Sequence, residues 1–301
     1  MTQIATPALR EWIVQQTVAG FSPEQVLSAM VAAGWEAGVA EATLENTLRD
    51  ALRNRAPGAD VAVAAPVAPL KASAQAAKAA AGAVPVPTMD LSQSPRMLDA
   101  GDRQVAVLST LASPRVVVLG GLLSNEECDA LIAAARPRMA RSLTVETKTG
   151  GEELNESRTS NGMFFNRGES ELIQRIEARI ARLLNWPVEN GEGMQVLYYG
   201  VGAEYKPHYD YFDPAEPGTP TILKRGGQRV GTLVMYLNEP ERGGGTTFPD
   251  VSLEVAPQRG NAVFFSYDKP DPSTRTLHGG APVIEGEKWV ATKWLRQGVF
   301  E

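Results

Sequence analysis

The chain has one cysteine, two histidines and no surplus of positive charge among its 301 residues. A single cysteine, Cys128, excludes an internal disulfide framework and a cysteine-rich metal site. The formal net charge of −6, without a visible basic stripe, gives no support to a nucleic-acid partner, because phosphate binding needs a net or local basic field. No run of about 18 apolar residues occurs, so we expect no transmembrane helix and no membrane partner.

The N-terminus also gives no indication of export. The stretch MTQIATPALREWIVQQ lacks a basic segment followed by an uninterrupted apolar core, which is the pattern of a signal peptide. The single cysteine fits a reducing compartment, and we expect a cytoplasmic protein. The length allows one large domain, or a large domain with a small one.

Residues 1–55 have the pattern of a small three-helix domain. Apolar residues recur at helical spacing, and Ser22 with Gln25 can form a capping box at the start of the second helix. Residues 56–95 are rich in Ala, Pro and Val and nearly lack large apolar and aromatic side chains. Such a segment buries too little surface to offset its ordering entropy, so we predict a disordered linker.

We place the main domain at residues 96–301. Its first part contains two amphipathic helices, and the helix after Ser124 has Glu127 at the capping-box position. After Gly193, short β-branched or aromatic runs are separated by Gly and Pro: MQVLYYG, RVGTLVMYLNE, VSLEVAP, NAVFFSY and KWVATKWLR. Helices followed by many short strands predict an α+β domain whose core is a sandwich or barrel.

The stretch EYKPHYDYFD contains one of the two histidines, His208, and a carboxylate two residues later, Asp210. On an extended strand, side chains at i and i+2 leave the same face roughly 7 Å apart along the strand, so both can reach one ion. The second histidine, His278, follows in TLHGGAPVIEGEKW, and Lys288 comes ten residues after it. The alternative is an aromatic strand that happens to carry a His and an Asp, since a lone histidine is more often structural than a ligand.

Two imidazoles and one carboxylate on one side of a metal form the facial triad of non-haem Fe(II) oxygenases, which leaves coordination positions open. Both histidines of the chain fall within this pattern. Strand-like segments separate its two halves, as a sandwich requires if the halves are to face each other. These features favour a metal site over a packed strand.

At this point the sequence resembles the prolyl 4-hydroxylase-like branch of the Fe(II)/2-oxoglutarate dioxygenases, over roughly residues 113–298. The segments that carry the resemblance are VLGGLLSNEECDALI, VLYYGVGAEYKPHYDYF, RVGTLVMYLNE, GGGTTFPD, VAPQRGNAVFF and LHGGAPVIEGEKWVATKWLR. The resemblance implies a double-stranded β-helix (jelly-roll) core with flanking helices. With the N-terminal bundle, the expected fold class is therefore α+β.

The resemblance also implies a role for each matching residue. The expected Fe(II) ligands are His208, Asp210 and His278. The 2-oxoglutarate site would use Lys288 for the distal carboxylate, Tyr199 and Thr246, and the substrate side would use Arg158, Tyr205 and Tyr211. Four of these residues have a structural alternative: a solvated strand lysine for Lys288, a core aromatic for Tyr199, a turn role for Thr246 and a surface salt bridge for Arg158. Core packing is the expectation for Trp294.

The reaction that the resemblance implies couples oxidative decarboxylation of 2-oxoglutarate, with O2, to hydroxylation of a substrate C–H, and uses ascorbate as reductant. The expected substrate is a prolyl residue of a peptide or protein. Collagen is not assumed, because the chain lacks the disulfides and extra domains of the collagen enzymes, and Ala281 stands where several animal members have cysteine.

Two alternatives remain open at this stage. One is hydroxylation of a free amino acid or another small molecule. The other is a non-catalytic binding protein that responds to oxygen or metal, in which the N-terminal helices recruit a partner. The complete set of His208, Asp210, His278 and Lys288 argues against an inactive protein.

Overall fold

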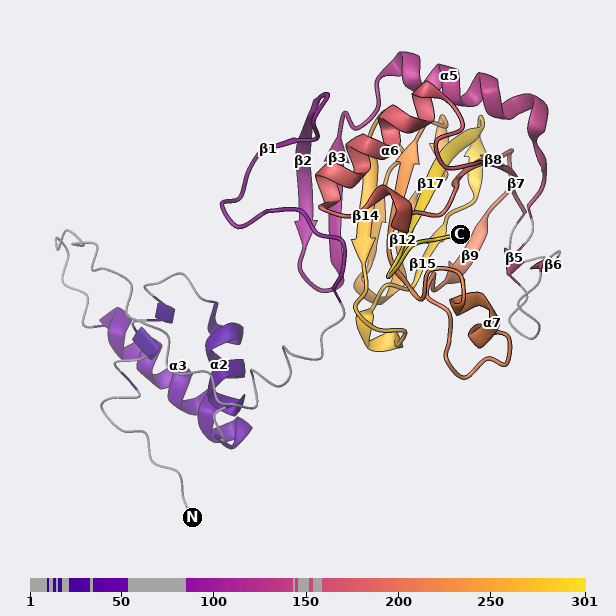
Figure 1. Cartoon of the computed structure of the whole chain (residues 1–301). Coiled ribbons are helices and arrows are strands. Elements are labelled where there is room, and N and C mark those ends of the chain that lie inside the picture. The colour runs from indigo at the N-terminus through magenta and orange to yellow at the C-terminus, as the bar shows by residue number, and fades with distance from the viewer. Residues whose placement is uncertain are drawn as a thin grey trace. The chain divides into compact units, whose positions relative to one another are not determined.

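The computed structural model describes Arg10 and residues 13–14, 16–17, 22–32, 35–53, 85–142, 144–145, 152–153 and 159–301. These residues belong to two compact units, Met1–Lys78 and Ala79–Glu301, and each unit is considered by itself (Figure 1). No helix in the described ranges has the length and apolar character that crossing a membrane requires.

The N-terminal unit contains helices α2 (Pro23–Ala32) and α3 (Ala37–Arg53). The predicted capping box of α2 is confirmed, since the Ser22 N–H donates to Gln25 Oε1 at 2.8 Å and the Gln25 N–H donates to Ser22 Oγ at 3.3 Å. A small core forms around Val26, Met30 and Leu44. Only scattered residues of the first predicted helix are described, so the three-helix bundle stays a prediction.

A nine-stranded, fully antiparallel sheet dominates the second unit (Figure 1). Its strands, in spatial order, are β1 (Met97–Asp99), β2 (Gln104–Leu111), β3 (Arg115–Gly120), β14 (Ala262–Ser266), β10 (Arg229–Tyr236), β17 (Lys288–Arg296), β8 (Met194–Tyr199), β7 (Asn161–Phe165) and β4 (Ala140–Arg141).

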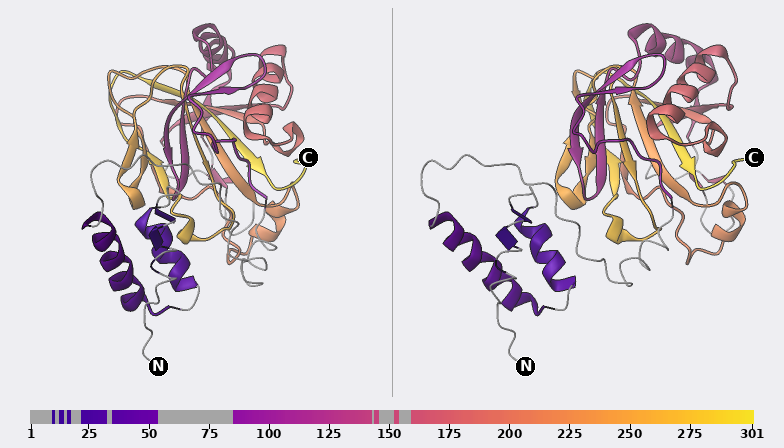
Figure 2. Two further views of the ribbon diagram at one scale, coloured as in Figure 1. Left: turned by 90° about the vertical axis from the view of Figure 1, so that its left-hand side faces the viewer. Right: turned by 60° about the vertical axis from the view of Figure 1, so that its left-hand side comes forward.

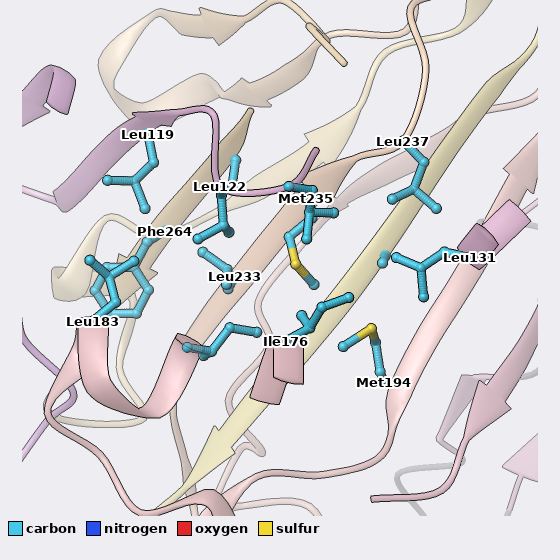
Figure 3. Close-up of a cluster of buried hydrophobic side chains, with 14 of the residues drawn as sticks. Leu119, Leu122, Leu131, Ile176, Leu183, Met194, Leu233, Met235, Leu237 and Phe264 are labelled. Carbon is cyan, nitrogen blue, oxygen red and sulfur yellow. The ribbon is translucent and has the colours of Figure 1, made fainter. Parts of the chain in front are cut away.

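Helices α5 (Asn125–Ala135) and α6 (Glu171–Leu184) cover one face of this sheet (Figure 2). The predicted capping box of Ser124 and Glu127 is present at the start of α5. Alternate strand residues, such as Leu233, Met235 and Phe264, point toward the helices and pack against them (Figure 3). The large sheet and its flanking helices thus share one apolar core.

The other face packs against a second antiparallel sheet. Its strands, in spatial order, are β13 (Leu253–Val255), β12 (Thr246–Phe248), β15 (His278–Gly280) and β9 (Tyr205–His208). Phe248 of this sheet meets Phe265 of β14 edge to face, with ring centres 5.2 Å apart, and Val290 of β17 belongs to the same buried cluster. Two facing antiparallel sheets with outer helices are consistent with a jelly-roll core.

Short elements complete the unit. They are the paired strands β11 (Arg242–Gly243) and β16 (Val283–Glu285), the paired strands β5 (Thr144–Val145) and β6 (Glu152–Glu153), helix α7 (Thr219–Leu223), and the 3₁₀ turns Arg136–Arg138, Val188–Asn190, Pro249–Val251 and Pro272–Thr274.

The predicted linker extends to residue 95, but residues that pack against the main domain begin before that position. Met89 is buried in the core beneath α6, and the Thr88 N–H donates to the Leu184 carbonyl at 2.9 Å. A single methionine in a run of small and polar residues gave too little apolar signal to predict this anchor. Residues 54–84 lie outside the described residues.

Candidate metal centre and substrate cleft

The two histidines face each other across a pair of strands. In the pairing of β9 with β15, His208 lies directly opposite His278. Strand β9 ends at His208, and Asp210 lies in the bend that follows. The Nε2 atoms of His208 and His278 are 3.6 Å and 3.4 Å from the two carboxylate oxygens of Asp210, and the three candidate ligand atoms lie within 4.8 Å of one another. The pairing therefore brings all three predicted ligands to one point.

Each imidazole is oriented by its other ring nitrogen. The Nδ1 atom of His208 lies 2.9 Å from the Lys206 carbonyl, and Nδ1 of His278 lies 3.0 Å from the Thr276 carbonyl. A carbonyl can only accept, so each Nδ1 carries a proton, and Nε2 is the ring nitrogen left to bind a metal. Burial, together with the neighbouring His278, lowers the pKa of His208. Neutral imidazoles with free Nε2 atoms are what a metal ion requires.

The carboxylate of Asp210 is buried and ionised. Burial acts to raise its pKa, but the neighbouring histidines, His278 first and then His208, hold the pKa well below its usual value. The ring of Tyr205 stacks on His208, with centres 3.7 Å apart. Two nitrogens and one oxygen from a single side fit an Fe(II) ion with open positions.

Lys288 lies behind this cluster at the start of β17, where it pairs with Tyr199 of β8. Its ammonium lies 5.3 Å from the centre of the Tyr199 ring, and a methyl group built on Gly280 would lie 3.6 Å from Nζ. Thr246 pairs with Gly280 across the small sheet and accepts a hydrogen bond from the Tyr236 hydroxyl at 2.8 Å. The three residues predicted for 2-oxoglutarate therefore gather around Gly280, two positions after His278.

The ammonium of Lys288 is buried without an anion. It is 4% exposed, and it makes no hydrogen bond and no ion pair with any residue in the described part of the chain. Burial lowers its pKa to about 8, which the more distant charge of Glu254 only partly opposes. A buried cation without a counter-charge is unfavourable and fits a site that receives a carboxylate.

A cleft of about 740 Å³ opens onto His208 and Asp210. Tyr205 and Tyr211, which were predicted for the substrate side, both line it. Trp294 lines it too, although the sequence favoured core packing for this residue. The predicted Arg158 lies outside the described residues. Phe212 and Arg229 also line it.

Comparison with known proteins identifies the family. The model of the 2OG-Fe(II) oxygenase superfamily matches residues 194–296. Prolyl 4-hydroxylase 5 of Arabidopsis thaliana is 42% identical over 222 residues, which cover 67% of this chain and 74% of the plant protein. The chain belongs to the prolyl 4-hydroxylase-like 2OG-Fe(II) oxygenases.

A second plant relative agrees with this assignment. Prolyl 4-hydroxylase 1 of the same plant is 45% identical over 204 residues, which cover 62% of this chain and 70% of the relative. Among solved structures, the viral collagen prolyl hydroxylase of Paramecium Bursaria Chlorella virus-1 is 34% identical, with a TM-score of 0.46, and the match covers 60% of this chain and 95% of the viral chain. As a family member, this protein is a 2-oxoglutarate-dependent dioxygenase that uses Fe(II), 2-oxoglutarate and O2.

The sequence reasoning missed a buried charge cluster at the base of the dioxygenase cleft. Glu192 accepts from Arg229 Nε and from Arg296 Nε, both at 2.6 Å. The Arg229 guanidinium also lies 4.1 Å from the centre of the Trp294 ring. Arg296 has the same strand parity as Lys288, so alternation along β17 could have placed it on the cleft side. The β-bulge between Arg229 and Gly231 removes that signal for Arg229.

Two more groups that were missed hold the segment around Asp210. Gln228 forms a reciprocal pair with the backbone of Phe212, because its Oε1 accepts from the Phe212 N–H and its Nε2 donates to the Phe212 carbonyl, both at 2.8 Å. Thr232 donates from Oγ1 to Asp210 Oδ2 at 2.7 Å. Between Arg229 and Tyr236 at its ends, Thr232 is the one polar side chain of strand RVGTLVMY, and that contrast is the signal that could have found it.

Proposed function

We propose that this dioxygenase hydroxylates prolyl residues in a peptide or protein. The cleft carries the proposal, because its volume of about 740 Å³ falls in the range of pockets that hold drug-sized ligands and exceeds what one amino acid fills. The relatives that share 42% and 45% of their aligned residues with this chain are named prolyl 4-hydroxylases.

In this proposal His208, Asp210 and His278 hold Fe(II). The ion supplies activation of O2 coupled to decarboxylation of 2-oxoglutarate, with ascorbate as the reductant that maintains the ferrous state. The protein contributes geometry: the register of β9 with β15 fixes the two Nε2 atoms, and the Nδ1 hydrogen bonds fix the ring orientations. The open side of the triad faces the cleft.

Lys288 receives the distal carboxylate of 2-oxoglutarate, and Tyr199 and Thr246 lie beside it. The support is the buried ammonium together with the position of Thr246, which pairs with Gly280. Because Thr246 Oγ1 accepts from Tyr236, its own proton remains available to a carboxylate oxygen.

The aromatic walls receive the substrate. Tyr205, Tyr211 and Trp294 line the opening onto His208, where they can pack against a pyrrolidine ring and exclude water from the metal. The indole N–H of Trp294 is buried without a hydrogen-bond partner among the described residues, so a peptide carbonyl could occupy that position.

Three finer assignments are part of the same proposal. The two facing sheets form a jelly roll, which the shared buried cluster supports. The N-terminal unit recruits a partner, which its separate small core supports. The protein acts in the cytoplasm, which its single buried cysteine supports.

The test measures succinate release with Fe(II), ascorbate and 2-oxoglutarate. The substrates would be proline-rich peptides with acidic, neutral or basic flanks and, separately, free proline and other amino acids. We expect hydroxyproline in a peptide by mass spectrometry, and no turnover by His278→Ala. Tyr198→Phe, on the helix-facing side of β8, is the control that retains turnover. Turnover of free amino acids alone would replace peptide hydroxylation with the small-molecule alternative, and absence of metal and 2-oxoglutarate binding would overturn the proposal.

A further inference from the structure

The carboxylate of Asp210 has a second partner besides the histidines. The Thr232 hydroxyl donates to Oδ2 at 2.7 Å, and the Tyr267 hydroxyl lies 3.0 Å from Thr232 Oγ1. Thr232 is fully buried and Tyr267 is 3% exposed. Strand β10 supplies Thr232, and Tyr267 follows the end of the neighbouring strand β14, so the large sheet reaches across to the ligand of the small one.

The hydrogen bonds that link Tyr267, Thr232 and Asp210 all donate in one direction, toward the carboxylate. An ionised carboxylate only accepts, so the single Thr232 proton must point at Asp210. The oxygen of Thr232 is then left to accept, and the Tyr267 hydroxyl must donate to it. Burial, and next the charge of Asp210, raises the pKa of Tyr267 well above its usual value, so this donor keeps its proton.

We propose that Thr232, supported by Tyr267, is a positioning residue that occupies Oδ2 of Asp210 and so makes Asp210 a one-oxygen ligand through Oδ1. The inference rests on the proposed iron site. The hydrogen bond has the length of a strong charge-assisted contact, and both of its partners are buried, so water does not compete with it.

The number of open positions on the metal gives this contact its importance. Three ligand atoms from the protein leave three positions on a six-coordinate ion, which 2-oxoglutarate and O2 together fill. A carboxylate that turned both oxygens to the metal would take one of these positions. By holding Oδ2, Thr232 keeps the third position open, and Tyr267 prevents the Thr232 hydroxyl from rotating away.

Three substitutions test the hydrogen-bond chain from Tyr267 through Thr232 to Asp210. Thr232→Val removes the hydroxyl with little change of shape, Thr232→Ser retains it, and Tyr267→Phe removes only the second donor. Tyr198→Phe is the matched control on the opposite face of the sheet. Mn(II) affinity, the visible spectrum of the Co(II) complex, which reports coordination number, and 2-oxoglutarate affinity would be measured, with near-ultraviolet circular dichroism as the check on folding.

We expect Thr232→Val to weaken Mn(II) binding about 10- to 100-fold, as loss of an outer-shell partner typically does. Its Co(II) spectrum should change, and 2-oxoglutarate should bind more weakly. Tyr267→Phe should weaken Mn(II) binding about fivefold, in line with the loss of one neutral hydrogen bond. Thr232→Ser and Tyr198→Phe should match the wild type.

The possible failures are distinguishable. If the wild type binds Mn(II) and Thr232→Val or, where that variant does not fold, Tyr267→Phe matches it in affinity and Co(II) spectrum, this inference is wrong and the iron site stands. If Thr232→Ser is as impaired as Thr232→Val, the hydroxyl is not the cause and the inference is also wrong. If the wild type binds neither Mn(II) nor Co(II), the proposed function fails and the inference fails with it.

Discussion

Two lysines on strand β17 are almost equally buried, yet their surroundings differ. Lys293 is 2% exposed and points toward the helices, where Nζ donates to Glu177 Oε1 at 2.5 Å and to the Glu192 carbonyl. Lys288 is 4% exposed and points the opposite way, toward the small sheet. Among the described residues it has no hydrogen bond and no ion pair.

The difference separates a structural charge from a functional one. Charges on the helix side are paired within the protein: Arg179, for example, bonds both Asp102 and Glu127. On the cleft side Arg229 and Arg296 are paired with Glu192, but the Lys288 ammonium has no hydrogen bond or ion pair among the described residues. The Nε2 atoms of His208 and His278 have only the Asp210 carboxylate beside them. Buried polar groups normally have partners, so a site that lacks them is one whose partners arrive from solution.

Lys288→Met should show the largest effect. Loss of a buried charge partner commonly costs about 2–5 kcal/mol of binding, so we expect the KM for 2-oxoglutarate to rise at least about 30-fold. The stability of the ligand-free protein should rise, by about 1–3 kcal/mol, because an unpaired buried ammonium is removed. Titration with 2-oxoglutarate and chemical denaturation would measure the two quantities. A destabilised variant with normal co-substrate affinity would show that Lys288 is structural.

Lys293→Met is the matched substitution on the helix-facing side of β17. Removing it leaves the Glu177 carboxylate buried, with the Gly168 N–H as its remaining donor, so we expect a loss of about 3–5 kcal/mol in the free energy of unfolding. The KM for 2-oxoglutarate should change little at a temperature where the variant is folded. Equal effects of the two lysine variants on either quantity would remove the distinction between the two faces.

The sequence marked one side of this contrast, because Lys288 stands out by its spacing from His278 and by the family resemblance. It was not used to predict Lys293, although alternation along KWVATKWLR places the two lysines on opposite faces of a strand. The capping residues of α2 and α5 were likewise predictable, since a capping box lies within four residues. The α+β class followed from the order of helical and strand patterns.

Contacts between distant segments were not predictable. Thr232 reaches Asp210 only because two sheets face each other, and Glu192 meets Arg296 across 104 positions. Strand parity predicts which side of β17 carries Trp294. It does not predict whether that side packs into a core or lines a cleft. The anchor at Met89 was missed for the same reason, since its burial depends on α6, far along the chain.

The pH dependence of 2-oxoglutarate binding should test whether the charge of Lys288 holds the co-substrate. Its pKa in the ligand-free protein is about 8, below the usual 10.5, because burial disfavours the charged form. The ammonium is present below pH 8 and is lost as the pH rises above it. The Kd for 2-oxoglutarate should therefore be flat below pH 8 and rise up to about tenfold per pH unit above it. Lys288→Arg, which stays charged, should abolish this rise, and an equal rise in both proteins would assign it to another group.

The smallest effect should come from removing the N-terminal unit, because the described residues that pack on both faces of β17 all lie within residues 85–301. A chain beginning at residue 85 retains these residues, so it should keep the stability of the catalytic unit and turn over short peptides within about twofold of the full chain. A chain beginning at residue 96 is the control. It loses Met89 from the core, and we expect about 2–5 kcal/mol less stability. A drop in short-peptide turnover with the first truncation would place part of the substrate site in the N-terminal unit.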